Sequence, residues 1–402
     1  MKTPSPSGAL WVGIAGTAAT AIGLPVSGAH SVATSWLVGI GFWTAMALGM
    51  LLMVLIWHVL DSSWPIVLRR QFEHGLAAFP WLCLMFAPLI LASCLGSGDA
   101  VWPWMNPLHQ VGGGRTVAAD LLYAKKAAVL NLPLFSVLSM AFFAAWIWMS
   151  ARLRKASFAQ DADGDARWTL RNRFTSGFGI PLAALTLTAA AVYWFKSLEY
   201  HWFSTMYGVW YFTDCARGAM ALGVIIMVWL YRRGDFRGIL SAGHMWAIGQ
   251  LMLTFTVFWA YISFDQYFLI WNANVPEETF WYNIREYGDW WYVSLFLVFG
   301  NFLVPFLVLL SYRFKVSHTA ALRTACMILA VVFVDIAYNI LPALKDARGG
   351  PQPFLSLNLL WAATSCVGIG GVCVAAYLRS LATTKLIPIH DPRIGECLHC
   401  NV

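Results

Sequence analysis

The chain has 402 residues, of which 59% are hydrophobic and only 11% are charged, and its formal net charge is +7. A soluble domain normally carries about 25% charged residues. This composition excludes a water-soluble globular protein, because much of the apolar surface must face lipid. The positive charge does not indicate nucleic-acid binding, since no basic patch with interleaved aromatics lies outside the apolar stretches. We expect the Lys and Arg residues on loops that contact lipid headgroups.

Ten apolar stretches follow one another along the chain, each long enough to cross a hydrocarbon core about 30 Å thick. Backbone groups in lipid must be hydrogen-bonded within their own segment, so each stretch is expected to be an α-helix. The predicted spans are 8–28, 32–60, 74–97, 127–151, 174–196, 205–231, 243–271, 289–312, 319–344 and 355–380. The sequence therefore predicts an all-α polytopic membrane protein in which residues 1–402 form a single membrane domain. The first stretch lacks a clear cleavage site, so we expect a retained span rather than a signal peptide.

Lys and Arg residues are distributed unevenly between the loops on the two sides of the membrane. With ten spans, the N-terminus, the even-numbered loops and the tail 381–402 lie on one side, and that side holds most of these residues. Cytoplasmic loops carry the excess of Lys and Arg. The asymmetry predicts that both termini are cytoplasmic.

The two halves of the chain look related. Residues 32–196 and 205–344 each contain four spans, and in each half the first hairpin turns through an Arg-Arg pair. These pairs are Arg69-Arg70 and Arg232-Arg233. We therefore expect two four-helix bundles flanked by two single helices, an arrangement of parallel repeats known in membrane proteins. In the last span, Gly368, Gly370 and Gly371 are expected to allow close helix packing.

Asp265 is the clearest ionisable residue inside an apolar stretch. A charged side chain at the centre of a membrane helix costs about 2.5–3.5 kcal/mol on insertion scales, so such residues are usually functional. Aromatic residues surround Asp265, and Ser263 and Gln266 are close enough in sequence to share a proton or a water with it. The alternative is an interfacial carboxylate at the end of the seventh span.

Two further pairs of polar residues have helical spacing within spans. Asp214 and Arg217 are three residues apart and therefore share one helix face, where they can pair. An ion pair that only locks helices together is an equal alternative to a proton relay. Asp335 and Asn339 are four residues apart, and Asp335 has no cation nearby in sequence, which favours a neutral, proton-exchanging carboxyl group.

Polar residues also gather at the ends of spans. His58 and Asp61 close the second span, while Glu73 and His74 open the third, so these side chains could pass protons inward at the cytoplasmic mouth. Ordinary interfacial residues would have the same pattern.

Acidic residues follow the seventh span in the run Pro276-Glu277-Glu278-Thr279. Pro at the first helical position and acids in the first turn are typical of a short helix. Glu277 and Glu278 are therefore candidates for an outer proton site, or simply helix-capping residues. The following aromatics are expected to form an interfacial belt. They are Trp281, Tyr282, Trp290 and Trp291.

The sequence predicts no catalytic residue, metal site or cofactor bound by this chain. A membrane b-haem needs paired histidines from facing spans, and the histidines lie mostly at span ends. Cys397 and Cys400 are followed by Asn401 rather than His, which excludes c-type haem attachment. The run Asp161, Asp163, Asp165 lacks the Gly and Glu positions of a calcium loop.

Several runs resemble a known family, the NrfD/polysulfide reductase-type membrane subunits of quinone-linked oxidoreductases. Within that family the chain is most similar to the ActF-type subunit of alternative complex III, a quinol:cytochrome c oxidoreductase. The matching runs are Phe258 to Trp271 (FWAYISFDQYFLIW), Asn274 with Pro276-Glu277-Glu278-Thr279, Trp202-Phe203-Ser204-Thr205, and Asp391-Pro392-Arg393. The resemblance covers most of the chain.

This resemblance implies an electron-transport role in a respiratory chain, in a bacterial inner membrane. The implied partners are lipids, a sister NrfD-like membrane subunit, an iron–sulfur subunit, and multihaem and monohaem c-type cytochromes. Haem c and iron–sulfur clusters would be bound by those partners, and quinol by the sister subunit. This chain would supply a scaffold and a path for proton translocation.

Three alternatives stay open. The chain itself could bind and oxidise quinol at an outer-face pocket containing Asp265, Gln266 and Glu277. It could also be a stand-alone secondary transporter, or a purely structural anchor. Co-purification with a c-type cytochrome would separate a complex subunit from a transporter.

Overall fold

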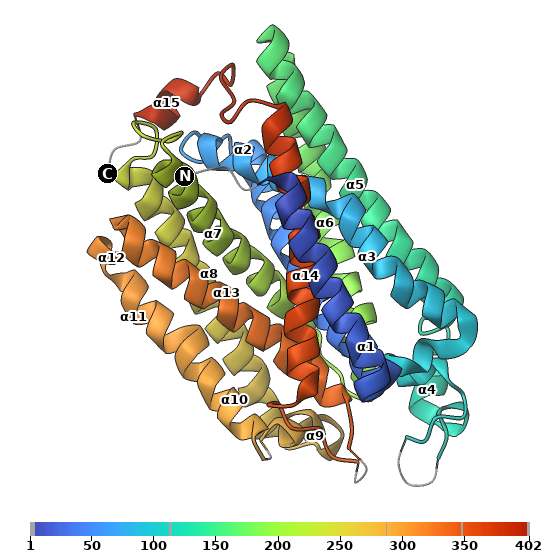
Figure 1. Ribbon diagram of the computed structural model, residues 1–402. Coiled ribbons are helices and arrows are strands. Elements are labelled where there is room, and N and C mark those ends of the chain that lie inside the picture. Colours follow the sequence, from blue (N-terminus) through green and yellow to red (C-terminus); the bar gives the residue numbers. More distant parts are fainter. Residues whose placement is uncertain (1–4, 112–114, 287, 347–348, 400–402) are drawn as a thin grey trace.

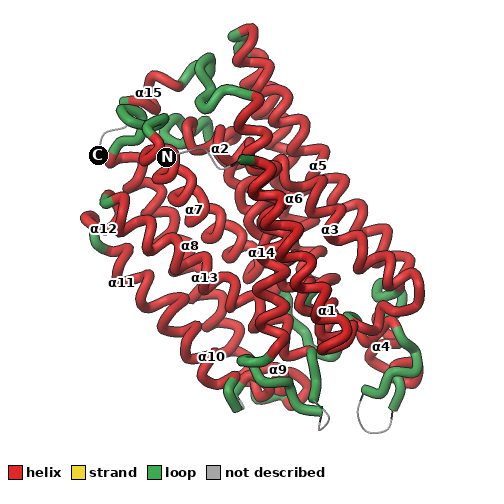
Figure 2. The backbone as a smooth tube through the Cα atoms, in the orientation of Figure 1, coloured by secondary structure: helices red, strands yellow, loops and turns green. Residues whose placement is uncertain are grey.

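The computed structural model describes residues 5–111, 115–286, 288–346 and 349–399. This part of the chain is almost entirely helical, without strands apart from two isolated bridges (Figures 1 and 2). The helices are α1 (Pro6–Val59), α2 (Ile66–Gly75), α3 (Phe79–Ala92), α4 (Leu121–Lys126), α5 (Leu132–Asp163), α6 (Arg167–Trp194), α7 (Tyr207–Arg233), α8 (Ala242–Ala273), α9 (Pro276–Arg285), α10 (Trp290–Phe296), α11 (Val304–Leu310), α12 (Tyr312–Val316), α13 (His318–Ile340), α14 (Leu357–Thr383) and α15 (Ile394–Leu398). A π-helical segment, η7 (Leu297–Leu303), joins α10 to α11, and a 3₁₀ turn, η6 (Lys196–Glu199), follows α6.

Nine helical stretches of the described residues are long and apolar enough to cross a membrane. The first, α1, has 54 residues, which corresponds to about 80 Å of helix and far exceeds a bilayer. It breaks at Gly28, where φ is 82° and ψ is 166°, a backbone conformation that glycine adopts without strain. The two arms, 6–27 and 29–59, therefore cross separately. With α1 counted twice, the structure confirms an all-α polytopic membrane protein of about ten spans.

Both arms of α1 pack against α14 and run in opposite directions along it (Figure 1). In the first arm, Gly16 lies so close to Gly368 that a Cβ at Gly16 would be 2.5 Å from the Gly368 nitrogen. In the second arm, the Ser35 carbonyl accepts a hydrogen bond of 2.9 Å from Ser365 Oγ. Small residues allow this approach, as expected for membrane helices. The glycines of the last span therefore do allow close helix packing.

Replacement of Gly16 by alanine is expected to destabilise the protein by about 1–3 kcal/mol, because the added methyl group must push the α14 backbone away. The measurement is the thermal unfolding midpoint of the purified protein in detergent. Gly177 on α6 is the matched control, since a Cβ there meets nothing within 4 Å. Equal midpoints for G16A and G177A would contradict the packing argument.

The chain turns alternately at the two ends of the bundle. We name the end that carries α2 and α15 the terminal face, and the other end, which carries α4 and α9, the opposite face (Figure 1). Helix α5 continues to Asp163, well beyond the predicted end at residue 151, and ends at Gly164 in the left-handed conformation. Residues of α5 therefore reach the terminal face, where they contact α2 and the chain tail.

Candidate functional site

Asp214 and Arg217 form a buried ion pair on α7. Their spacing of three residues places them on one helix face, and Arg217 Nη2 donates to Asp214 Oδ1 over 3.0 Å. Both side chains are fully buried. Arg217 Nη1 also donates to the backbone carbonyl of Asn301, over 3.1 Å. Asn301 lies in η7, and π-helical segments often occur at functional sites.

Asp335 brings a second carboxyl group to this pair from α13. Its Oδ2 accepts hydrogen bonds from Trp259 Nε1 (2.6 Å) and Trp210 Nε1 (3.1 Å). Asn339, one turn on, donates from Nδ2 to the backbone carbonyl of Asp335 (3.0 Å). The carboxyl group of Asp335 is also close enough to Asp214 for the two to interact electrostatically. Two buried carboxyl groups avoid mutual repulsion when one of them carries a proton.

These residues form a polar centre to which α7, α8, η7 and α13 all contribute. We name it the central cluster, consisting of Asp214, Arg217, Trp259, Asn301 and Asp335. With both acids ionised the cluster would hold one uncompensated negative charge in a low-dielectric interior, which is costly. One proton on either acid removes that charge. Both side-chain polar atoms of Asn301 lack a hydrogen-bond partner among the described residues, and such groups commonly hold buried water.

A cavity of about 720 Å³ adjoins the central cluster. Asp335 lies in its wall, and more than half of the other wall residues are aromatic, contributed by α7, α8, α9, α10, η7, α13 and the segment before α7. Its other polar lining residues are Ser263, Gln266, Glu286, Ser294 and Asn339, with the tyrosines Tyr207, Tyr261, Tyr267, Tyr282 and Tyr338. On the outer side, Tyr261 and Phe264 are 61% and 65% exposed. In a spanning helix such side chains face lipid, so the cavity connects a buried carboxyl group to the lipid-facing surface.

Asp265, the strongest candidate from the sequence, does not belong to this cluster. Its side chain is half-buried on α8 and is not part of the cavity wall, and within the described residues it has neither a hydrogen bond nor an ion pair. The next residue, Gln266, lines the cavity and accepts a hydrogen bond of 2.6 Å from Ser204 Oγ. Adjacent helix positions point about 100° apart, which separates the two side chains.

The short helix predicted from Pro276 is present as α9, with Glu277 and Glu278 in its first turn. Glu277 is exposed and Glu278 is half-buried, and neither contributes to the cavity wall. The structure therefore does not bring these acids together with Asp214 and Asp335.

The interfacial belt was predicted wrongly for two of its residues. Trp281 and Trp290 are only 6% and 1% exposed, whereas Trp291 is 45% exposed. Trp281 stacks on Trp202 with the ring centroids 4.4 Å apart, so these two rings form part of the cavity wall. The aromatic composition of a short segment does not show which side of its helix is buried.

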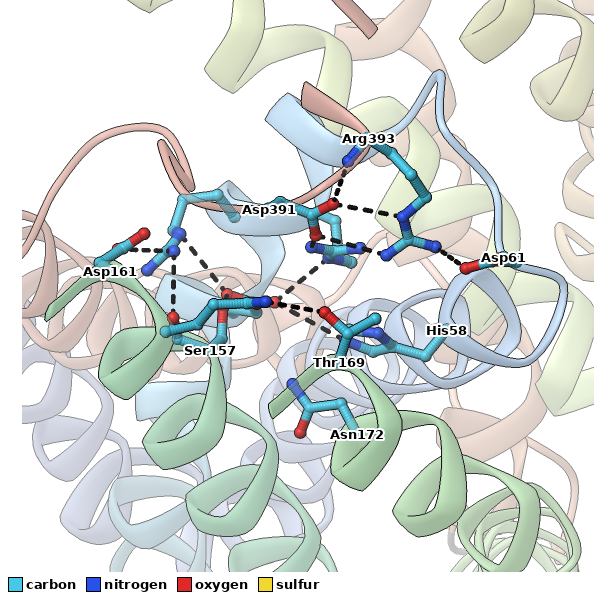
Figure 3. Close-up of polar contacts among 12 residues, drawn as sticks. His58, Asp61, Ser157, Asp161, Thr169, Asn172, Asp391 and Arg393 are labelled. Carbon is cyan, nitrogen blue, oxygen red and sulfur yellow. Dashed lines mark hydrogen bonds and ion pairs between the residues drawn. The ribbon is translucent and has the colours of Figure 1, made fainter. Parts of the chain in front are cut away.

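A second buried cluster lies at the terminal face. Glu73 on α2 is fully buried and lies between Arg69 Nε (3.4 Å) and Arg70 Nε (3.6 Å). Ser157 Oγ on α5 donates to Glu73 Oε2 over 2.6 Å, and His58 Nε2 is 3.9 Å from Oε1. We name these five residues the terminal-face cluster; Figure 3 shows the surrounding contacts. Both ring nitrogens of His58 lack a hydrogen-bond partner among the described residues, so water can complete this site.

A shell of ion pairs surrounds this cluster. Asp391 Oδ2 lies 2.5 Å from Arg69 Nη2, and Asp161 Oδ2 lies 2.7 Å from Arg70 Nη2. Asp61 is at the rim, where it pairs with Arg393 (Figure 3). It also pairs with Arg173. His74 is not part of the cluster, because its Nδ1 lies 2.9 Å from Ser380 Oγ on α14.

The position of His58 and Glu73 at neighbouring span ends predicts that they lie close together, as they do in the structure, but it does not indicate the residues around them. Asp391 and Arg69 are 322 residues apart in sequence, so no local spacing indicates their pairing. The same holds for Arg70 and Asp161. Asn301 was also missed, since nothing in an apolar run signals a π-helical segment.

The chain tail is held to the terminal face by Asp391. Burial raises the pKa of this carboxyl group, but Arg69 and Arg393 outweigh burial and hold the pKa well below its ordinary value. A carboxyl group whose pKa is lower in the folded than in the unfolded protein stabilises the fold at any pH above its unfolded pKa, which is about 3.9 for Asp. That stabilisation is lost as the pH falls through the folded pKa. The tail is therefore expected to stay docked from neutral pH down to about pH 4.

Replacement of Asp391 by asparagine is expected to release the tail at neutral pH, because Arg69 and Arg393 lose their shared carboxylate. The measurement is hydrogen exchange of peptides from 386–399 between pH 4 and 8, where we expect at least severalfold faster exchange in D391N. The control is D163N, which removes a carboxylate whose ion pair with Arg167 is largely exposed. Unchanged exchange in D391N would show that other contacts hold the tail.

The amino-acid sequence matches no model of a known protein family, and no curated protein is significantly similar to it.

Proposed function

We propose that the chain is the proton-conducting and scaffolding subunit of a membrane-bound quinol:cytochrome c oxidoreductase of the alternative complex III type. The observation that carries the proton role is the central cluster, in which the buried carboxyl group of Asp335 accompanies the buried Asp214–Arg217 ion pair between helices that span the membrane. Buried ionisable residues of this kind in membrane proteins usually mark proton relays or ion pathways. The resemblance of the sequence to ActF-type subunits supports the choice of complex.

In this proposal, Asp214 and Asp335 exchange one proton between them, while Arg217 stabilises whichever carboxyl group is ionised. The unpaired amide of Asn301 holds water beside them. Glu73 and His58 supply protons from the terminal face, which we assign to the cytoplasm from the charge asymmetry. Electron transfer takes place in the partners: a sister membrane subunit, an iron–sulfur subunit and c-type cytochromes. The host membrane is then a bacterial inner membrane.

The test uses the whole complex purified in mild detergent, with haem staining of every associated band. Complexes carrying D335N or D214N are reconstituted in liposomes, and protons translocated per electron are measured. We expect the ratio to fall severalfold while electron transfer continues. D163N is the control, since Asp163 is exposed at the terminal face. An unchanged ratio in both cluster variants, or a chain that purifies without any cytochrome, would overturn the proposal.

A second candidate is quinol binding by this chain, which the cavity beside Asp335 favours. Its aromatic walls suit a flat ring, its lipid side gives access from the bilayer, and Asp335 can accept a hydrogen bond from a hydroxyl group. Of the three residues predicted for such a pocket, only Gln266 lines the cavity.

This candidate is tested with a photoreactive quinone analogue. Ala260 lies in the cavity wall, so A260W should block labelling of this chain without affecting its fold. Labelling confined to another subunit would rule the candidate out.

A further inference from the structure

Two lysines converge on one aromatic ring at the opposite face, away from both clusters. Lys126 at the end of α4 has its Nζ 3.9 Å from the centre of the Phe203 ring, and Lys196 in η6 has its Nζ 5.7 Å from the same point. Both ammonium groups also donate to neighbouring backbone carbonyls, Lys126 to Tyr200 and Lys196 to Trp202. The two lysines are close enough to repel each other.

The carboxylates near these lysines are engaged elsewhere. Asp120 accepts hydrogen bonds from Tyr200 Oη (2.7 Å) and the backbone N–H of Leu122 (3.0 Å), and its Oδ2 lies 2.6 Å from His201 Nε2. Its charge attracts Lys126 without forming a direct ion pair. Glu199, three residues after Lys196, pairs instead with Arg285 and Lys345.

Within the described residues, neither Lys126 nor Lys196 forms an ion pair. Each ammonium group has three N–H donors, and only one donor of each is used by a carbonyl. Like charges held side by side favour binding of an anion between them.

The surroundings of the pair are apolar and exposed. Phe203 is 44% exposed, Leu121 is 74% exposed and Val129 is 52% exposed. Val129 and Phe203 lie shortly before the spanning helices α5 and α7, where headgroups are expected to meet the hydrocarbon core, and Leu121 begins the short helix that carries Lys126. A lipid phosphate fits this setting better than an acidic partner protein, because acyl chains would cover these apolar side chains.

We infer that Lys126 and Lys196 bind the phosphate of a phospholipid in the leaflet at the opposite face, with Phe203 beneath the headgroup. This site goes beyond the proposed function and does not depend on it. It would bind one lipid tightly enough to remain through purification.

Native mass spectrometry of the purified chain, titrated with phosphatidylglycerol in detergent, tests the site. We expect one tightly bound lipid in the wild-type chain. In K126Q/K196Q we expect its binding to be weaker by on the order of tenfold, since each basic residue near a membrane surface strengthens the attraction of anionic lipids severalfold. K125Q is the control, because Lys125 is exposed and makes no contact with Phe203. The thermal midpoint of each variant shows whether it is folded.

A second variant, K126R/K196R, keeps both charges and should retain the lipid even if the glutamine variant unfolds. Displacement of the lipid by inorganic phosphate at millimolar concentration would assign a free-anion site and overturn the lipid assignment. Equal loss in K125Q, retention in K126Q/K196Q, or loss in K126R/K196R would overturn it as well. So would absence of bound lipid from the wild-type chain.

Discussion

Replacement of Arg217 by methionine is expected to lower the free energy of unfolding by about 3–5 kcal/mol, the cost of removing one partner from a buried ion pair. Arg217 is fully buried, pairs with Asp214 and donates to the Asn301 carbonyl in η7. Without the guanidinium, two carboxyl groups remain in the interior with no cation among the residues of the central cluster. The measurement is unfolding of the purified chain in detergent, followed by circular dichroism against temperature.

The double variant D214L/R217M separates the charge effect from a packing effect. It removes both members of the pair, and replacing a whole buried pair by apolar side chains is often neutral or stabilising. We therefore expect the double variant to recover most of the stability lost in R217M. R167M is the exposed control, expected within about 0.5 kcal/mol of the wild type. If R217M were as stable as the wild type, the guanidinium would not be the compensating charge of the central cluster.

The architecture could be predicted from composition because lipid imposes a simple rule: each long apolar stretch must be a helix. The predicted spans 8–28 and 32–60 leave a break between residues 28 and 32, and α1 is interrupted at Gly28, at the edge of that break. The end of α5 was missed by twelve residues, from 151 to Asp163. The apolar stretch used to predict the span ends where charged residues begin. The helix itself continues into the polar region, where Asp161 pairs with Arg70.

The candidate site could be predicted only where local spacing decides it. Helical periodicity joins Asp214 to Arg217, and the structure pairs them. It cannot show that Trp210 and Trp259 donate to Asp335 from other helices. It also cannot tell which side of α8 faces inward, and this is why Gln266 lines the cavity while Asp265 does not. A role for Asp265 in proton transfer stays a prediction.

The two halves differ in what fills their interiors, although their sequences look related. Between α3, α5 and α6 the core is aromatic, as in the contact of Phe86 with Trp194 at 4.5 Å between ring centroids. Between α7, α8, η7 and α13 the core holds the central cluster and the cavity. Aromatic packing gives a rigid interior without proton-exchanging groups at the same depth. The proposed proton exchange inside the membrane therefore belongs to the second half, and the first half contributes the terminal-face cluster, which supplies the protons.

Replacement of Glu73 by glutamine is expected to lower the free energy of unfolding and to impair proton uptake. The glutamine can keep the hydrogen bond from Ser157, but Arg69 and Arg70 lose the carboxylate between them. We expect a loss of about 3 kcal/mol, the lower end of the range for breaking a buried pair, because Asp391 and Asp161 still pair with the two arginines. The measurements are the thermal midpoint and protons translocated per electron in the reconstituted complex.

The control for this variant is E278Q, because Glu278 is half-buried in the first turn of α9 and does not contribute to either cluster. E73D distinguishes the two roles of Glu73, since it keeps the charge between the arginines but shortens the side chain. If the carboxylate only neutralises Arg69 and Arg70, E73D should have most of the stability that E73Q loses. In that case a complex with folded E73Q should also translocate protons normally. If Glu73 takes up protons, translocation should fall severalfold in E73Q under conditions where electron transfer and the fold are intact. We expect reduced translocation. The ring nitrogens of His58 are buried without hydrogen-bond partners among the described residues, and Nε2 lies 3.9 Å from the Glu73 carboxylate, so water can join the two groups.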